Sequence, residues 1–319
     1  MFFDVYRAKK NVGFLALGIT FIFVFSMALQ ILISIFVSMY APWMLDHAFW
    51  SWAIGSFPMY FCAMPLSLLF FRQCKAVEVP MKRKIGLREF LGTLAVCYVG
   101  IYVFNIIGEM ANNFFSAMLG REAINEIVEV TTSAPMWVNI LFTVLLAPIY
   151  EELFFRKLVI DRLLPYGEIP AILISGVAFG LIHGNFNQFF YAAAVGMIFG
   201  VVYTRTGNIR YSIVMHMILN AFGGVFAAEM QKLLDGGSWG GVFADIPGET
   251  IGYVMSSIYF LIVIVAFVGA VIALANYRKR YIPFKRPYFG PTAQDWVQML
   301  VFNPPVWMFL AVSALMFVM

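Results

Sequence analysis

A stretch in the middle of the chain, residues 138–158, has the sequence VNILFTVLLAPIYEELFFRKL. Its first twelve residues are strongly apolar and predict a helix inside a lipid bilayer, whose hydrocarbon core is roughly 30 Å thick. Two adjacent carboxylates, Glu151 and Glu152, follow soon after, and Arg156 lies four residues beyond the second. Ionisable side chains within a membrane span are costly, so they are candidates for function. The stretch therefore predicts a membrane-spanning helix that carries a polar site.

The composition of the whole chain is that of a membrane protein. Of its 319 residues, 62% are hydrophobic and 12% are charged, whereas an ordinary soluble domain has roughly 25% charged residues. The segment 1–36 has the basic-then-apolar order of a signal peptide, but its apolar part exceeds the roughly 7–15 residues of a cleavable one. This predicts a retained first span. We predict an all-α, polytopic transmembrane helical bundle in which residues 1–319 form one integral membrane domain.

The distribution of basic residues predicts the topology. The bundle is expected to have about 8–9 spans, drawn from the apolar segments 12–40, 49–71, 90–112, 136–158, 169–187, 189–204, 211–231, 250–276 and 304–319. If the connections alternate between sides, all but two of the 21 Lys and Arg residues lie on one side, the exceptions being Arg121 and Lys232. Because basic residues concentrate in cytoplasmic loops, this predicts a cytoplasmic N-terminus. The loops 73–89 and 277–298 are then inside, and 232–249 is outside.

Cysteine usage and net charge indicate no further ligand. Cys62, Cys74 and Cys97 form an odd set without a CxxC spacing, and those inside apolar runs are interpreted as small buried residues. The net charge of +4 is explained by the membrane topology and requires no nucleic-acid partner.

Polar residues recur in three of the predicted spans. Glu151 and Glu152 lie in the fourth, His183 in the fifth and His216 in the seventh, with Asn220 one helical turn further. At 1.5 Å per residue, Glu151, His183 and Asn220 lie roughly 16–22 Å above the inner ends of their helices, and His216 roughly 10 Å. These levels overlap, so three helices can bring their polar side chains into one site.

Helical spacing pairs some of these residues with neighbours on the same face. Glu152 and Arg156 are four residues apart and can form an ion pair. Phe179 and His183 have the same spacing, whereas Glu151 lies about 100° away from Glu152 around its helix. Each residue also has a structural explanation, since an ion pair can merely hold helices together and a lone histidine can hydrogen-bond to a neighbouring helix. Only the combination indicates a functional site.

Three short motifs occur in order on these spans. They are EExxxR (Glu151, Glu152 and Arg156), FxxxH (Phe179 and His183) and HxxxN (His216 and Asn220). Together they resemble the CPBP family of intramembrane proteases, which includes CAAX-processing and bacteriocin-processing enzymes and the type II CAAX prenyl endopeptidases. The resemblance covers roughly residues 136–222, which we interpret as the catalytic core. The flanking transmembrane spans within 1–135 and 250–319 inform little about the substrate.

The resemblance implies hydrolysis of a peptide bond inside a membrane cavity. It assigns Glu151 to the activation of water, with help from His183. It makes His216 and Asn220 hydrogen-bond donors to the developing oxyanion, a contribution typically worth about 3–4 kcal/mol per donor.

Three further residues would support this chemistry. Glu152, paired with Arg156, would fix the helix end and keep Glu151 oriented, and Phe179 would shape the pocket beside His183. The sequence leaves open which of the two adjacent glutamates is the base.

A zinc ion is the alternative to a mechanism without a cofactor. Glu151, His183 and His216 form a ligand set that catalytic zinc uses, with water in the fourth position. The sequence has no HExxH motif, and Asn220 is a poor zinc ligand but a good oxyanion donor. This favours a glutamate-dependent enzyme that requires no cofactor, and leaves a metalloprotease with one zinc open.

Two other classes of function remain open for a chain with these residues. A catalytically silent protein of this fold would act in bacteriocin immunity or as a scaffold. A transporter would use Glu151, Glu152 and His183 as a proton relay, although the inverted repeat of many transporters is not apparent. We expect a protease whose partners are the bilayer and a peptide or protein substrate, in a prokaryotic plasma membrane. The prenylation of the substrate and the oligomeric state stay open.

Overall fold

The chain forms a bundle of helices in the computed structural model, which describes residues 3–77, 79, 83–238, 245–277, 284 and 290–318. No β-strand occurs within these residues, and seven helices are long and apolar enough to cross a membrane. An eighth crossing is counted if the bent pair at the C-terminus is one span. The predicted all-α, multi-pass membrane bundle is therefore confirmed.

The first three spans precede the motif-bearing region. They are α1 (Val5–Tyr40), the run of α2 (Ala48–Phe57), π-helix η2 (Pro58–Ala63) and α3 (Met64–Phe71), and α4 (Leu87–Met118). The short helices η1 (Pro42–Met44) and α5 (Glu126–Ser133) lie in connections.

The motif-bearing spans follow. The fourth consists of α6 (Met136–Asn139), π-helix η3 (Ile140–Leu146), α7 (Ala147–Glu152), π-helix η4 (Leu153–Ile160), α8 (Asp161–Leu163) and η5 (Leu164–Tyr166). Next come α9 (Glu168–Leu181), α10 (Phe186–Thr206) and the run of α11 (Arg210–Asn220), π-helix η6 (Ala221–Phe226) and α12 (Ala227–Leu234). The chain closes with α13 (Gly248–Tyr277), α14 (Ala293–Leu300) and α15 (Pro304–Val318).

Two of the predicted spans differ from expectation. The helix α9 has 14 residues and is about 21 Å long, less than the roughly 30 Å of a hydrocarbon core. It stops before the predicted end at 187 because Gly184 takes a φ of 67° and Asn185 then caps α10 by accepting a hydrogen bond from the Gln188 N–H. The predicted last span, 304–319, is α15, which is bent by 61° relative to α14.

The connections separate into two groups, one at each end of the bundle. Contacts at the first end, here called the inner end, join Asn303 to Lys9, Arg162 to Phe71, Tyr211 to Ile85 and Arg205 to Glu168. At the opposite end, Arg121 donates to Val318 and Lys232 donates to Ala134. Arg121 and Lys232, the two basic residues that the charge pattern places apart from the others, thus lie at the end of the bundle away from the inner end.

The other topology predictions concern Arg156, two loops and the side of the membrane that the inner end faces. Arg156, which the charge pattern counts with the inner basic residues, is instead fully buried within the bundle. The basic stretch 278–289, apart from Phe284, lies outside the described residues, as does 239–244 of the outer loop. The assignment of the inner end to the cytoplasm stays a prediction.

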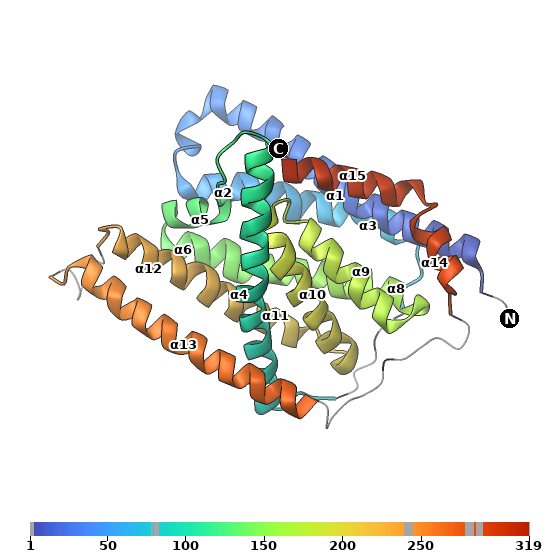
Figure 1. The fold of residues 1–319 in the computed structure, drawn as a ribbon. Helices are drawn as coiled ribbons and strands as arrows, with labels where there is room; N and C mark the ends of the chain where they lie inside the picture. Colours follow the sequence, from blue (N-terminus) through green and yellow to red (C-terminus); the bar gives the residue numbers. More distant parts are fainter. Residues whose placement is uncertain are drawn as a thin grey trace.

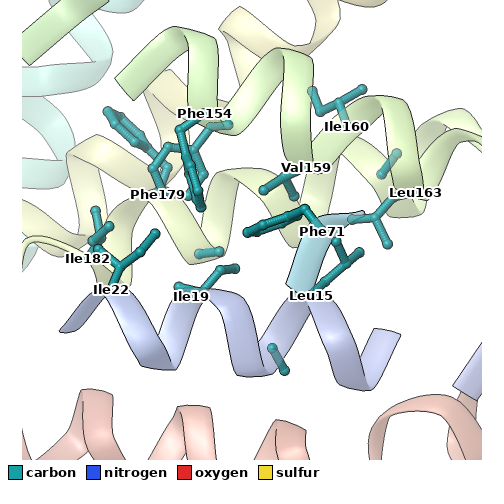
Figure 2. Close-up of a cluster of buried hydrophobic side chains, with 14 of the residues drawn as sticks. Leu15, Ile19, Ile22, Phe71, Phe154, Val159, Ile160, Leu163, Phe179 and Ile182 are labelled. Carbon is teal, nitrogen blue, oxygen red and sulfur yellow. The ribbon is translucent and has the colours of Figure 1, made fainter. Parts of the chain in front are cut away.

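A hydrophobic core packs α1 against the fourth span. Figure 2 shows Leu15, Ile19 and Ile22 of α1 facing side chains that include Phe154 and Val159. Beside this core, α1 and α15 run together, while α13 lies at the edge of the bundle against α4 and α12 (Figure 1). The fourth span is therefore held in the interior.

Glycines bring α9 and α10 close together. A Cβ on Gly180 would lie 2.6 Å from the carbonyl oxygen of Phe189, and a Cβ on Gly196 would lie 2.8 Å from the Phe179 ring. Small residues permit such close helix packing inside membranes. The approach holds Phe179 beside the polar residues of the fourth span.

Candidate active site

The adjacent glutamates lie at the centre of the bundle. Glu151 is about midway along the 31-residue fourth span and is 7% exposed, while Glu152 is fully buried. Both end α7, between the π-helices η3 and η4. Pro148 near the start of α7 has no N–H to donate, and π-turns inside helices are frequent at functional sites. The local backbone thus departs from regular α-helix on both sides of the glutamates.

Glu152 forms the ion pair with Arg156 that their spacing predicts. The Arg156 Nε and Nη2 donate to the two carboxylate oxygens at 2.8 and 3.1 Å. The Ser175 hydroxyl accepts from Arg156 Nη1 at 3.3 Å, and the guanidinium lies 5.3 Å from the Phe179 ring centroid and 5.8 Å from that of Phe199. A buried pair is stable only when further hydrogen bonds satisfy its charges, and α9 supplies one of them.

The imidazole of His216 lies between the two glutamates. Its Nε2 is 3.9 Å from the nearer Glu151 oxygen, and its Nδ1 is 3.4 Å from Glu152 Oε1. The second contact does not meet the geometry of a hydrogen bond, and Nδ1 has no other partner among the described residues. The rings of Phe179 and Phe199 each lie 5.7 Å from the imidazole. The motifs on the fourth and seventh predicted spans therefore meet in space.

His183 was predicted to lie within a helix over 169–187, but it lies in the turn that follows the end of α9 at Leu181. Its Nδ1 is 2.8 Å from the backbone oxygen of Phe179, and because a carbonyl only accepts, Nδ1 carries the proton. In the neutral ring this leaves a lone pair on Nε2. The Phe179 ring contacts both imidazoles, with its centroid 5.1 Å from that of His183 and 5.7 Å from that of His216.

Asn220 makes a different contact. Its side-chain amide donates to the backbone oxygen of Thr143 in η3 at 2.8 Å, which ties α11 to the fourth span. No hydrogen bond in the described part of the chain joins it to Glu151, His183 or His216. An Asn amide has two N–H groups, so one remains available beside this contact.

Tyr60 is a site residue that the sequence analysis missed. Its hydroxyl, on η2 of the second span, donates to Glu151 Oε1 at 2.8 Å, and its ring stacks on Tyr150 with centroids 5.3 Å apart. It is one of 15 tyrosines in the chain. The segment FPMYFCAMP around it, with Pro58 and Pro65, is the only local signal, and prolines alone predict an irregular helix rather than a site.

The possible metal ligands do not gather into a cluster. Among the described residues, no group of three His, Cys, Asp or Glu side chains is placed to hold a metal ion. Glu151, His183 and His216 in this arrangement therefore do not fit a three-ligand zinc site, and we derive no step through a metal.

Comparison with known proteins finds similarity over the segment that carries the motifs. The family model described as "Type II CAAX prenyl endopeptidase Rce1-like" matches residues 133–222, a range that contains all three motifs. A Bacillus subtilis (strain 168) protein named "Putative membrane peptidase YdiL" is 29% identical over 181 residues, which are 55% of this chain and 71% of that protein. No solved structure matches the chain.

Fold, site and similarity define the class of the protein. It is a multi-pass membrane protein with a buried Glu–His centre, and the segment that carries its motifs, residues 133–222, is similar to the type II CAAX prenyl endopeptidases. This similarity supports a CAAX-type intramembrane endopeptidase-like protein.

Proposed function

We propose that the chain hydrolyses a peptide bond in a membrane-associated peptide or protein tail, with Glu151 activating the attacking water. The surroundings of its carboxylate are the main support. One oxygen accepts from Tyr60 at 2.8 Å, and the other lies 3.9 Å from His216 Nε2. Two hydrogen bonds of about 2.8 Å span up to roughly 5.6 Å, so a water can bridge the carboxylate and the imidazole. A general base needs this reach.

The proton balance assigns the remaining roles. Glu151 takes a proton as the water oxygen bonds to the substrate carbonyl carbon, and returns it to the amine nitrogen when the carbon–nitrogen bond breaks. His183 supports the water through Nε2, because its Nδ1–H is directed to the Phe179 carbonyl.

The carbonyl oxygen of the substrate gains negative charge in this step. We assign its stabilisation to the second N–H of Asn220 and to the His216 Nε2–H, which turns from the bridging water to this oxygen as the water attacks. For this role the His216 Nε2 must carry a proton, while Nδ1 faces Glu152 at 3.4 Å. Glu152 and Arg156 hold the helix, and Phe179 orients both imidazoles.

A C-terminal tail at the inner leaflet is the proposed substrate. The matching family is described as prenyl endopeptidases, which act on such tails. The inner end of the bundle, predicted to be cytoplasmic, would receive a tail anchored in that leaflet.

Hydrolysis by proteoliposomes tests the proposal. Prenylated and unprenylated CAAX peptides and a leader-type peptide are compared as substrates. Glu151→Gln keeps the shape of the side chain but removes the base, so hydrolysis should fall about 100-fold or more, with the variant still purifying as a folded protein. Full activity of Glu151→Gln would end the protease proposal.

The mechanism is proposed to need no cofactor, and elemental analysis of the purified protein tests this separately. About one zinc per chain would overturn it if that zinc is lost in Glu151→Gln, His183→Ala and His216→Ala but kept in Asn220→Ala.

A further inference from the structure

A long apolar groove lies apart from the candidate active site. It runs between α4, α10, α11 and α13, with a volume of about 1590 Å³, and none of the seven motif residues lines it. Its walls include Leu91 and Tyr98 of α4, Leu219 of α11 and Val265 of α13. Sites for small molecules occupy roughly 300–1,000 Å³. The groove is therefore large enough for a ligand with long apolar chains.

Charged residues gather at only one end of the groove lining. Arg83, Arg88, Glu89 and Arg205 line it near the inner end. Arg83 pairs with Glu89 at 2.6 Å, and Arg205 pairs with Glu168 at 3.4 Å. Arg88 is exposed and has no hydrogen bond or ion pair within the described part of the chain. Within the described residues, Arg88 is thus a cation without a counter-ion at the point where the apolar walls begin.

The dimensions of the groove match one leaflet of a bilayer. Along α4 the lining extends from Leu87 to Tyr98, a rise over eleven residues of about 16 Å. Half of a hydrocarbon core is about 15 Å. The outer wall, α13, has only 6% of its most apolar window buried, so it stands in the lipid itself.

We propose that this groove binds one anionic glycerophospholipid of the inner leaflet. Its phosphate pairs with Arg88, and its acyl chains lie along α4 and α13. Arginine suits this role because its planar guanidinium offers two parallel N–H donors to phosphate oxygens. A partner protein's transmembrane helix could occupy the same groove, but it would not explain why Arg88 has no counter-ion among the described residues.

Lipid retention tests the proposal. The purified full-length protein is delipidated in detergent and given equal amounts of phosphatidylglycerol and phosphatidylcholine with identical acyl chains. Native mass spectrometry then counts the bound lipids. Wild type should retain phosphatidylglycerol in preference. Arg88→Gln should reduce that preference about fivefold, the effect of one basic residue at an anionic membrane surface.

Two variants complete the test. Arg72→Gln is the matched control, because Arg72 is also exposed at the inner end but does not line the groove, and it should keep the preference. Ala266→Trp places a large side chain on a lining position and should reduce retention of both lipids. Equal retention of both lipids by wild type, or an equal fall in Arg72→Gln, would overturn the proposal. Displacement of the lipid by soluble glycerol phosphate would also overturn it, since the site would then take the phosphate alone.

Discussion

Two arginine–glutamate pairs in this protein have almost the same geometry but opposite surroundings. Arg156 contacts Glu152 with N···O distances of 2.8 and 3.1 Å, and Arg83 contacts Glu89 at 2.8 and 2.6 Å. The side chains of the first pair are 0% exposed, whereas those of the second are 38% and 30% exposed. Water can replace the partner in the second pair but not in the first, so burial decides what each pair contributes.

The pairs also differ in what surrounds them. Among the described residues, Arg83 and Glu89 have their polar side-chain contacts with each other. The buried pair also reaches Ser175 on α9 and His216 on α11. It therefore connects the three motif-bearing helices, and a change in it should reach the candidate site.

The largest expected effect comes from breaking the buried pair. Glu152→Gln leaves Arg156 as a buried charge without its counter-ion, so we expect the free energy of unfolding to fall by about 3–5 kcal/mol. Equilibrium unfolding in detergent micelles measures this. The double variant Glu152→Gln/Arg156→Met should recover most of the loss, because an apolar replacement of a buried pair is often tolerated. If Glu152→Gln were as stable as wild type, burial would not decide what the pair contributes to stability.

Tyr60→Phe should have the next largest effect, on activity. It removes a hydrogen bond to an ionised group, worth about 1.5–3 kcal/mol, which corresponds to a fall of roughly 10- to 100-fold in kcat if Glu151 is the base. KM should change little, since Tyr60 acts through its hydrogen bond to Glu151 and has no proposed contact with the substrate. Tyr150→Phe is the control, because Tyr150 stacks on Tyr60 but makes no hydrogen bond to Glu151 in the described structure. Equal losses in both variants would assign the effect to packing.

Ser175→Ala should lower the free energy of unfolding by less than Glu152→Gln. It removes the hydroxyl that accepts from Arg156 and donates to the Phe155 backbone oxygen. We expect a loss of about 1–2 kcal/mol in the free energy of unfolding. Combined with Glu152→Gln, the two losses should not add, because residues of one hydrogen-bond network are coupled. Strict additivity would show that Ser175 is not part of the network.

Glu89→Gln should have the smallest effect. Exposed ion pairs contribute about 0.2–1 kcal/mol and are screened by salt, so its difference from wild type should shrink further between low and high ionic strength. Unfolding at two salt concentrations checks this. If Glu89→Gln lost as much stability as Glu152→Gln, the contribution of both pairs would depend on their geometry and not on their burial.

Features that depend on local sequence patterns could be predicted, whereas features that depend on packing between distant segments could not. The apolar runs predicted the bundle, and the spacing of Glu152 and Arg156 predicted their contact, because both depend on the geometry of single helices. The end of α9 depended on the positive φ of Gly184, which an apolar sequence does not reveal. The contact of Tyr60 with Glu151 depends on how the second span packs on the fourth, and nothing near Tyr60 in the sequence encodes that.

The short helix α9 bears on the thickness of the membrane around the protein. Its outward side chains Ile169, Leu173 and Val177 are 42%, 46% and 39% exposed, yet the helix is about 9 Å shorter than an average hydrocarbon core. A helix shorter than the hydrocarbon core is accommodated by local thinning of the bilayer, by snorkelling of flanking side chains or by oligomerisation, at a cost of fractions of a kcal/mol per ångström of hydrophobic mismatch. Because α9 and its terminal turn carry Phe179 and His183, lipid chain length acts on the same helix that orients the candidate catalytic groups.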